Sequence, residues 1–150
     1  MGAVTYPDAE VARRLNDDFV PCMVESAKAP DLARKMNVRW LPGLIVADAD
    51  ERPAHVQVGF LPPQELLTEL SFGAAIVAMG EKRYDDAHAL FREVAERPGA
   101  ERAPEAWYWW GISRYRQSKS FADCQDAWRN IVERWPDSQW VHKVSYALEA

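Results

Sequence analysis

The second half of the chain contains an internal repeat, and this repeat constrains the fold more than any other feature. Residues at spacings of three, four and three recur at an offset of 37 positions, first as Tyr84, Ala87, Phe91 and Val94, and then as Phe121, Cys124, Trp128 and Ile131. Each set lies on one face of a helix. A period slightly above about 34 residues is typical of helical-hairpin repeats, whose units bury their apolar faces only against one another. Residues 71–150 are therefore predicted to form an all-α array of helical hairpins.

The ends of the predicted helices are marked by residues that stop a helix. Pro98-Gly99 and Pro136-Asp137 follow the two repeated faces, and a proline cannot continue a helix because it lacks the N–H donor. A last helix, roughly Gln139 to Leu148, carries an apolar face and is expected to cap the array.

The first 70 residues have a different pattern, in which short apolar runs alternate with short helical patterns. The predicted order is helix, strand, helix, strand, strand and helix. Asp8 and Asp31 each precede a helical pattern, and an aspartate side chain can accept hydrogen bonds from the free amides of a first turn. We therefore expect these two residues to cap the first two helices, and Pro62-Pro63 to open the last one.

Three apolar stretches of the first half are predicted to be strands. Phe19–Val24 is the first, although Pro21 weakens its ladder locally because it has no N–H. Leu44–Val46 is a continuous apolar run, which is typical of a strand that is covered on both faces. Val56 and Val58 alternate with polar residues, so the third strand is expected to be half exposed.

Charge and hydropathy argue against several classes of partner. The formal net charge is -5, and no stripe of Lys and Arg offsets it, which disfavours binding to a phosphate backbone. No apolar run approaches the roughly 20 residues that span a bilayer, and the first ten residues lack the basic and apolar regions of a signal peptide. We therefore expect no nucleic-acid partner, no membrane association and a cytoplasmic location.

The sequence shows no pattern that predicts a reactive centre. Cys22 and Cys124 lie far apart, and two such cysteines form neither a disulfide framework nor a zinc site. We expect Cys124 to be buried, at the place that Ala87 takes in the preceding repeat. The histidines share no metal-ligand spacing and are expected on the surface or on helix faces; they are His55, His88 and His142. Our prediction is that the chain has no catalytic residue, no metal and no cofactor.

Residues 104–111 resemble the first helix of a tetratricopeptide repeat. Trp107, Trp110 and Gly111 match that family's aromatic, large and small positions, and Pro136 matches its terminal proline. The stretch departs from the family in one extra residue near positions 118–120, and in Cys124 at a site that is usually alanine. The resemblance implies two repeats and a capping helix over residues 71–150.

Residues 38–42 and 58–67 resemble the part of thioredoxin that follows its active-site motif. The loop Val38–Pro42 stands where that family has its cis-proline, and Val58–Leu67 is similar to its last strand and last helix. The resemblance implies a partial thioredoxin-like α/β domain with a mixed sheet over residues 1–70. It also implies a cis Leu41–Pro42 bond, in place of the trans form of most prolines. The family's Cys-x-x-Cys, first two strands and first helix would precede Met1.

These resemblances imply two functions. The first is a non-catalytic module that binds a protein or peptide, with Trp40, Leu41 and Pro42 presenting backbone to an extended peptide. On the helical array, four residues are expected near a peptide groove, unless they pack onto the first domain instead; they are Tyr108, Trp109, Ile112 and Arg116. The second is a truncated or mis-started thiol–disulfide oxidoreductase or thioredoxin-like chaperone. Thiol exchange needs a low-pKa thiolate and a resolving thiol beside it, so we expect no redox activity from residues 1–150 themselves.

The thioredoxin resemblance also implies an empty position in the sheet. In that arrangement, Phe19–Val24 and Gly43–Ala47 are not neighbours, because the strand between them would precede Met1. Unpaired backbone groups there cost on the order of 1–3 kcal/mol each. We therefore expect the position to be closed, either by direct pairing of the two strands or by a strand or helix from a second copy. The homodimer is favoured, because direct pairing needs a changed register.

Overall fold

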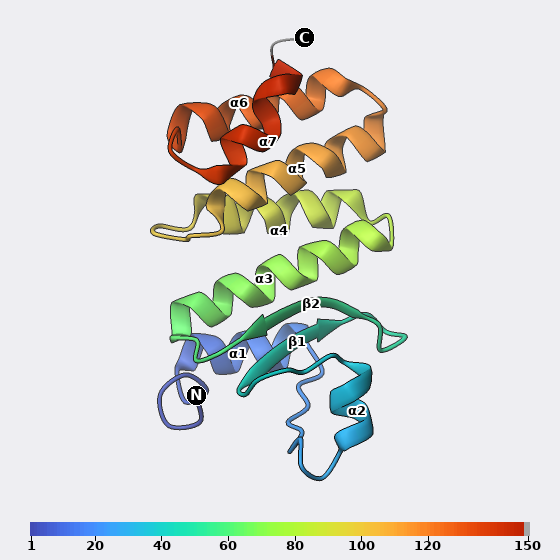
Figure 1. Cartoon of the computed structure of the whole chain (residues 1–150), viewed down its shortest axis with the longest axis vertical. Helices are drawn as coiled ribbons and strands as arrows, with labels where there is room; N and C mark the ends of the chain where they lie inside the picture. The colour runs from blue at the N-terminus through green and yellow to red at the C-terminus, as the bar shows by residue number, and fades with distance from the viewer. Residues whose placement is uncertain (149–150) are drawn as a thin grey trace. The chain divides into compact units, whose positions relative to one another are not determined.

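The computed structural model describes residues 1–148 (Figure 1). By its internal contacts the chain divides into two compact units, Met1–Leu70 and Ser71–Ala150, and the boundary falls inside helix α3 (Pro63–Gly80). Most of the described chain is helical, and its two strands form a small antiparallel sheet. None of the helices within residues 1–148 has both the length and the hydropathy needed to cross a bilayer.

Helix α1 (Ala9–Asp18) begins at the predicted capping residue. The Asp8 carboxylate accepts hydrogen bonds from the backbone N–H groups of Glu10, at 3.0 Å, and of Val11, at 3.1 Å. These bonds satisfy amides that have no partner inside the helix. The prediction of an Asp8 cap is confirmed.

Helix α2 (Pro30–Lys35) does not begin as predicted. Its N-cap is Ala29, which makes no side-chain capping bond, and Pro30 is the first helical residue. Proline is suited to this position because its φ is already helical and its missing N–H would have had no partner. Asp31 therefore lies in the first turn, and the expected Asp31 cap is wrong.

The sheet consists of β1 (Gly43–Ala47) and β2 (Pro53–Val58), which pair antiparallel with Ile45 opposite Val56. The turn between the strands is organised by Asp48. Its carboxylate accepts from the backbone N–H groups of Asp50, at 3.0 Å, and Arg52, at 2.9 Å, and from Arg52 Nε at 2.7 Å. The hydrogen bonds from Arg52, the backbone one first, lower the pKa of Asp48.

The segment Phe19–Val24 is not a strand, which corrects the sequence prediction. It lies outside the helices and the sheet, and Val20 is 97% exposed. A strand forms only when its N–H and C=O groups find a neighbouring strand, and in the described part of the chain this segment has none. The expected mixed sheet is therefore absent from residues 1–148, and so is direct pairing of Phe19–Val24 with β1.

The two strands are less covered than the sequence pattern predicts. In β1 only Val46 is fully buried, while Leu44 and Ile45 are partly exposed, so the strand is not covered on both faces. In β2 the apolar residues Val56 and Val58 lie on the exposed face. One face of this sheet thus presents apolar side chains to solvent, where a half-exposed strand usually presents polar ones.

The covered face of the sheet belongs to the core of the first unit. His55, on β2, was expected at the surface but is largely buried, because its ring contacts Glu69 of α3. Near the start of the chain, the buried Thr5 donates from its hydroxyl to the Leu61 carbonyl at 2.7 Å. The buried apolar side chains of this unit are Val11, Val46, Leu61, Leu66, Leu67 and Leu70.

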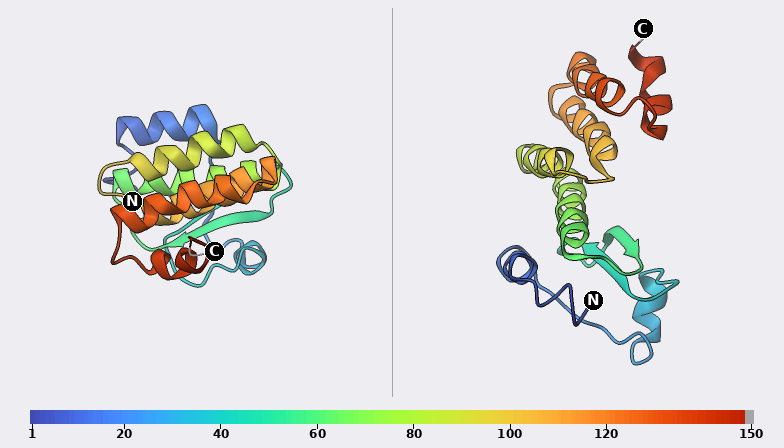
Figure 2. Two further views of the ribbon diagram at one scale, coloured as in Figure 1. Left: turned by 90° about the horizontal axis from the view of Figure 1, so that it is seen from above. Right: turned by 90° about the vertical axis from the view of Figure 1, so that its left-hand side faces the viewer.

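The second unit is all-α. It contains the end of α3 followed by α4 (Tyr84–Glu96), α5 (Ala103–Ser118), α6 (Phe121–Arg134) and α7 (Gln139–Leu148). Within this unit α4, α5 and α6 lie as successive layers (Figures 1 and 2), and α7 packs against α5 and α6. The structure thus confirms a helical array, and its last helix has the predicted bounds.

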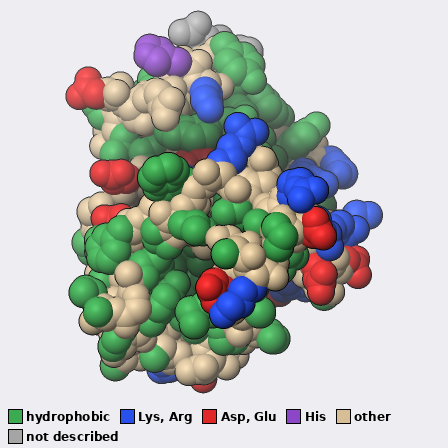
Figure 3. Space-filling view, turned by 60° about the horizontal axis from the view of Figure 1, so that its bottom comes forward, with side chains coloured by type: hydrophobic (Ala, Val, Ile, Leu, Met, Phe, Trp, Pro, Cys, Tyr) green, Lys and Arg blue, Asp and Glu red, His purple; other side chains and the backbone are tan. Residues whose placement is uncertain are grey.

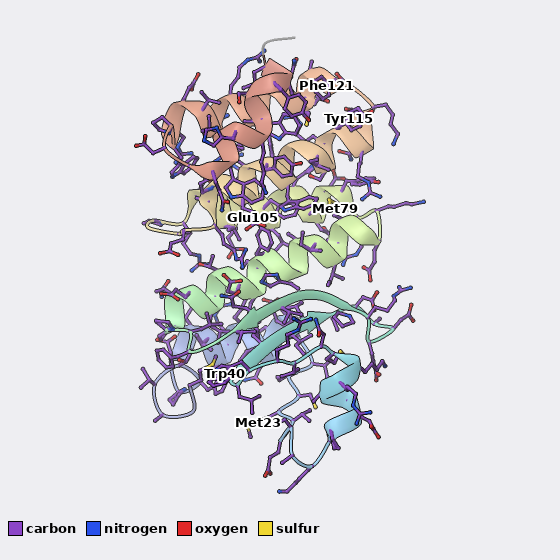
Figure 4. The ribbon with its side chains drawn as sticks, in the orientation of Figure 1. Met23, Trp40, Met79, Glu105, Tyr115 and Phe121 are labelled. Carbon is purple, nitrogen blue, oxygen red and sulfur yellow. The ribbon has the colours of Figure 1, made fainter. Side chains whose placement is uncertain are left out.

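The repeated helical faces point into the core of the second unit. The last three members of each set are buried; they are Ala87, Phe91, Val94, Cys124, Trp128 and Ile131. The first members differ, since Tyr84 is half-buried while Phe121 is partly exposed and contacts the Tyr115 ring edge-on at 6.2 Å (Figure 4). The burial of Cys124 confirms the prediction that it occupies, in the second repeat, the core position that Ala87 occupies in the first.

Helices α5 and α6 approach closely at Gly111. A Cβ atom at this position would lie 2.9 Å from Trp128 Nε1, 3.0 Å from Ala127 Cβ and 3.1 Å from the Cys124 carbonyl oxygen. These distances are shorter than ordinary van der Waals contacts. The glycine is therefore required by packing between the helices.

Candidate functional site

The first candidate site is the loop Trp40–Pro42, which leads into β1. The Leu41–Pro42 peptide bond is cis, as predicted from the thioredoxin resemblance. The Pro42 carbonyl accepts a hydrogen bond from the Gly59 N–H at 2.8 Å, so the end of the loop is fixed to the sheet. The loop is thus a defined surface feature, held by the strand pair that follows it.

The side chains and backbone groups of Trp40 and Leu41 are accessible to a ligand. Trp40 is 72% exposed and Leu41 is 55% exposed, and Figure 4 shows the Trp40 side chain on the outside of the first unit. Within residues 1–148, the backbone N–H and C=O groups of Trp40 and Leu41 make no hydrogen bond. The loop therefore offers both unpaired backbone groups and apolar side chains.

The second candidate site lies on α5, in the second unit. Its residues occur at helical spacings of three and four, which places them along one face; they are Tyr108, Trp109, Ile112 and Arg116. Trp109 and Ile112 are half-buried, and Arg116 is exposed. This face accordingly offers partly accessible apolar surface with a cation at one end.

Tyr108 is held in an aromatic cluster with residues of two other helices. Its ring stacks on Trp128 of α6 at 5.4 Å with an interplanar angle of 4°, and lies 5.0 Å from the Trp140 ring of α7. Its backbone carbonyl accepts from Trp128 Nε1 at 3.2 Å. Burial raises the pKa of the Tyr108 hydroxyl. The Tyr108 ring therefore packs inside the unit, and the Trp109 ring, which is also half-buried, lies edge-on to it at 5.5 Å.

The sequence indicated Trp140 of α7 as part of the apolar face of the capping helix, and neither Trp140 nor Lys143 as a site residue. The Lys143 ammonium lies 3.9 Å from the centre of the Trp140 ring, a cation–π contact, and Trp140 joins the cluster around Tyr108. The signal in the sequence was weak, because a tryptophan on a capping helix predicts core packing as readily as a surface site.

His88 of α4 is partly buried beside Trp110 of α5. The two ring centres lie 6.1 Å apart, edge to face, and the buried Nε2 atom of His88 has no hydrogen-bond partner among residues 1–148. Burial is the largest cause that lowers the pKa of His88. The ring is therefore held preferentially in its neutral form, which suits a packing residue.

The two cysteines lie in very different environments. Cys22 is exposed, whereas Cys124 is buried and has its pKa raised to about 11 by burial. A thiol with this pKa is protonated at neutral pH and is a poor nucleophile. Among residues 1–148, no three His, Cys, Asp or Glu side chains are grouped so that they could hold a metal ion.

Comparisons with known proteins give no match. No protein-family model matches the chain, no curated protein is significantly similar to it in sequence, and no solved structure is significantly similar to its fold.

Proposed function

We propose that this chain is a non-catalytic module that binds an extended segment of a protein or peptide, in a cytoplasmic setting. The observation that carries the proposal is the Trp40–Pro42 loop, in which Trp40 and Leu41 have exposed side chains and backbone groups that make no hydrogen bond within residues 1–148. An extended peptide can supply the missing hydrogen bonds through its own backbone, while its side chains contact Trp40 and Leu41.

The chemistry of the loop favours a peptide with apolar side chains. Tryptophan and leucine bury large apolar areas on binding, and tryptophan is enriched among the residues that dominate binding energies. The loop itself, Val38 to Pro42, carries one charged residue, Arg39, so specificity would come from shape and from backbone pairing more than from charge.

The α5 face is a separate candidate surface, within the second unit. Trp109 and Ile112 would contact apolar side chains of a segment bound there, and Arg116 would favour an acidic group near one end of that segment. Helical-hairpin arrays bind extended peptides along such faces.

We also propose the thioredoxin-like and tetratricopeptide-type architecture for the two units. The cis Leu41–Pro42 bond supports the first assignment. The close contact at Gly111 and the burial of Trp107 support the second, because both residues match positions in the repeat.

A peptide-binding experiment tests the proposal. Peptides selected from a random display library on the purified chain would be measured for affinity to the wild type, to Trp40→Ala and to Tyr146→Ala. Tyr146 is a matched control, since it is an aromatic residue on α7 with an exposure of 71%, close to the 72% of Trp40.

We expect Trp40→Ala to weaken binding by about tenfold or more, and Tyr146→Ala to leave it unchanged. The proposal is wrong if no peptide is enriched, or if the two variants bind every selected peptide as the wild type does. If Trp109→Ala lowers the affinity for a selected peptide and Trp40→Ala does not, the binding site lies on α5 alone.

A further inference from the structure

The outer edge of β1 presents backbone groups that have no partner in the described chain. In an antiparallel pair, hydrogen-bonded and non-hydrogen-bonded positions alternate. The Gly59 N–H donates to the Pro42 carbonyl at 2.8 Å, so Pro42 and Gly59 occupy a hydrogen-bonded position of the pair. In the register of the sheet, Leu44 and Val46 are then the next residues of β1 whose N–H and C=O groups point toward β2. The N–H and C=O groups of Gly43 and Ile45 therefore face away from β2, and within residues 1–148 they make no hydrogen bond.

A second stretch of the same unit is also without backbone partners. None of the residues from Val20 to Val24 makes a hydrogen bond in the described part of the chain. Their side chains are exposed, with Val20 at 97% and Met23 at 93%, and Figure 4 shows Met23 on the outside of the unit. The first unit thus has an open strand edge and a free apolar segment that do not pair with each other.

The first unit carries many apolar side chains at its surface. Figure 3, which brings the bottom of the Figure 1 view forward, shows hydrophobic side chains over much of the face that it presents. Large exposed apolar side chains of this unit include Val20, Met23, Val24, Trp40, Leu41, Val56, Val58 and Phe60. An exposed apolar surface of this kind beside an open edge is typical of an interaction site or an aggregation hazard. Its occupant must supply both backbone groups and apolar side chains, which is the chemistry of a β-strand.

We propose that this occupant is a second copy of the chain, and that the two copies exchange their free segments. Val20–Val24 of one copy adds to the β1 edge of the other, and the reverse pairing occurs at the symmetry-related position. Each copy carries one Val20–Val24 segment and one unpaired β1 edge, so a twofold dimer pairs both in both copies. β1 and the Val20–Val24 segment are each five residues long.

The position of Pro21 is compatible with this pairing. Along a strand, the backbone groups of alternate residues point to opposite edges, so Val20, Cys22 and Val24 share one edge while Pro21 and Met23 share the other. If Val20, Cys22 and Val24 pair with β1, Pro21 lies on the edge of the segment that faces away from β1. The N–H that proline lacks is not needed there for a hydrogen bond between the strands.

The open edge of β1 is better suited to pairing than the outer edge of β2. The five residues of β1 include no charged residue and no proline, whereas β2 begins at Pro53, directly after Glu51 and Arg52. Prolines and charges are features that keep an edge strand from pairing with another chain. The pairing strands, Val20–Val24 and β1, lie outside the proposed peptide site, although the apolar surface of this unit includes Trp40 and Leu41 of that site.

Light scattering on the full chain is the first test. At micromolar concentrations, the expected mass is twice the 17.1 kDa of one chain.

Two proline variants test which edge of the segment pairs. Cys22→Pro removes a backbone N–H donor from the edge that pairs with β1, and Met23→Pro, its matched control, removes one from the opposite edge. Neither residue makes a hydrogen bond within residues 1–148, so neither substitution should unfold the monomer, which circular dichroism would verify. We expect Cys22→Pro to raise the dimer dissociation constant by about tenfold or more, because the lost bond occurs twice per dimer, and Met23→Pro to leave it unchanged.

Cross-linking is the second test and identifies the strands that meet. In a Cys124→Ala, Ile45→Cys background, mild oxidation should give a covalent dimer whose peptides are linked between positions 22 and 45. The inference is overturned if the wild type is a monomer at all concentrations, or if both proline variants act alike. It is also overturned if the 22–45 link forms within one chain, or if the only dimer link joins position 45 to position 45.

Discussion

The Nε2 atom of His55 on β2 lies 2.6 Å from Oε2 of Glu69 on α3, and the two side chains are 10% and 9% exposed. This contact fixes the covered face of the sheet to the helix within the first unit. Buried polar groups are stable only when they are hydrogen-bonded, so the pair constrains how β2 and α3 are placed.

Glu69→Ala is expected to lower the free energy of unfolding by about 1–3 kcal/mol, because it leaves a buried imidazole without this carboxylate partner. Urea unfolding monitored by circular dichroism measures the change. Glu65→Ala is the matched control, since Glu65 lies one turn earlier on the same helix and is exposed. Equal midpoints for the two variants would contradict a structural role for the contact.

His88 should make stability depend on pH. Its pKa in the folded chain is lowered, chiefly by burial, so at pH values below the ordinary value of about 6.5 the unfolded chain binds more protons than the folded one. The free energy of unfolding should therefore fall as the pH drops from 7 to 5.5, by less than the single-proton limit of about 1.4 kcal/mol per pH unit. Denaturant titrations across this range should show a smaller slope for His88→Gln than for the wild type. His142→Gln, at an exposed residue of α7, should keep the wild-type slope, and a reduced slope in this control would refute the assignment.

Cys124 should react with thiol reagents far more slowly than Cys22. It is buried, and its pKa is raised to about 11, so both access and thiolate formation are restricted. Labelling of the native chain followed by mass spectrometry should modify Cys22 first. Cys124→Ala should retain the fold, whereas Cys124→Phe should lower the free energy of unfolding by roughly 1–3 kcal/mol through overpacking. Rapid labelling of Cys124 in the native state would show that the core of the helical unit opens readily.

Gly111→Ala should lower the free energy of unfolding by about 1–3 kcal/mol, because the added methyl group would overlap Trp128 and Ala127. Gly80→Ala supplies the control, since within residues 1–148 no atom outside the neighbouring residues and the adjoining helix backbone lies within 4 Å of the corresponding Cβ, and the position ends α3. This second change should be neutral or slightly stabilising, because alanine restricts the unfolded chain. Thermal unfolding of both variants distinguishes a packing effect from a general effect of replacing glycine.

Features set by local sequence could be predicted. The Asp8 cap depends on residues two and three positions away, and the repeated faces that contain Phe91 and Trp128 follow from helical periodicity. The cis bond before Pro42 was predicted in another way, from the resemblance of its loop to that of thioredoxin.

Features that depend on distant partners could not be predicted in the same way. Phe19–Val24 has the composition of a strand, but composition does not show whether a neighbouring strand exists. The burial of His55 depends on Glu69, fourteen residues later. For the candidate site on α5, the position of Trp109 on its helix could be predicted from the helical periodicity. The packing of Tyr108 against Trp128 and Trp140 could not, because those residues belong to helices that follow in the chain.

Gly111 also bears on the shape of the helical array. In an array of stacked helices, the curvature of the whole follows from the small rotation between neighbouring helices. At Gly111 the contact between α5 and α6 is limited by the absence of a side chain, so this residue helps to set the angle at which the two helices cross. A larger residue that the core could accommodate would therefore change the curvature of the surface that a bound segment meets.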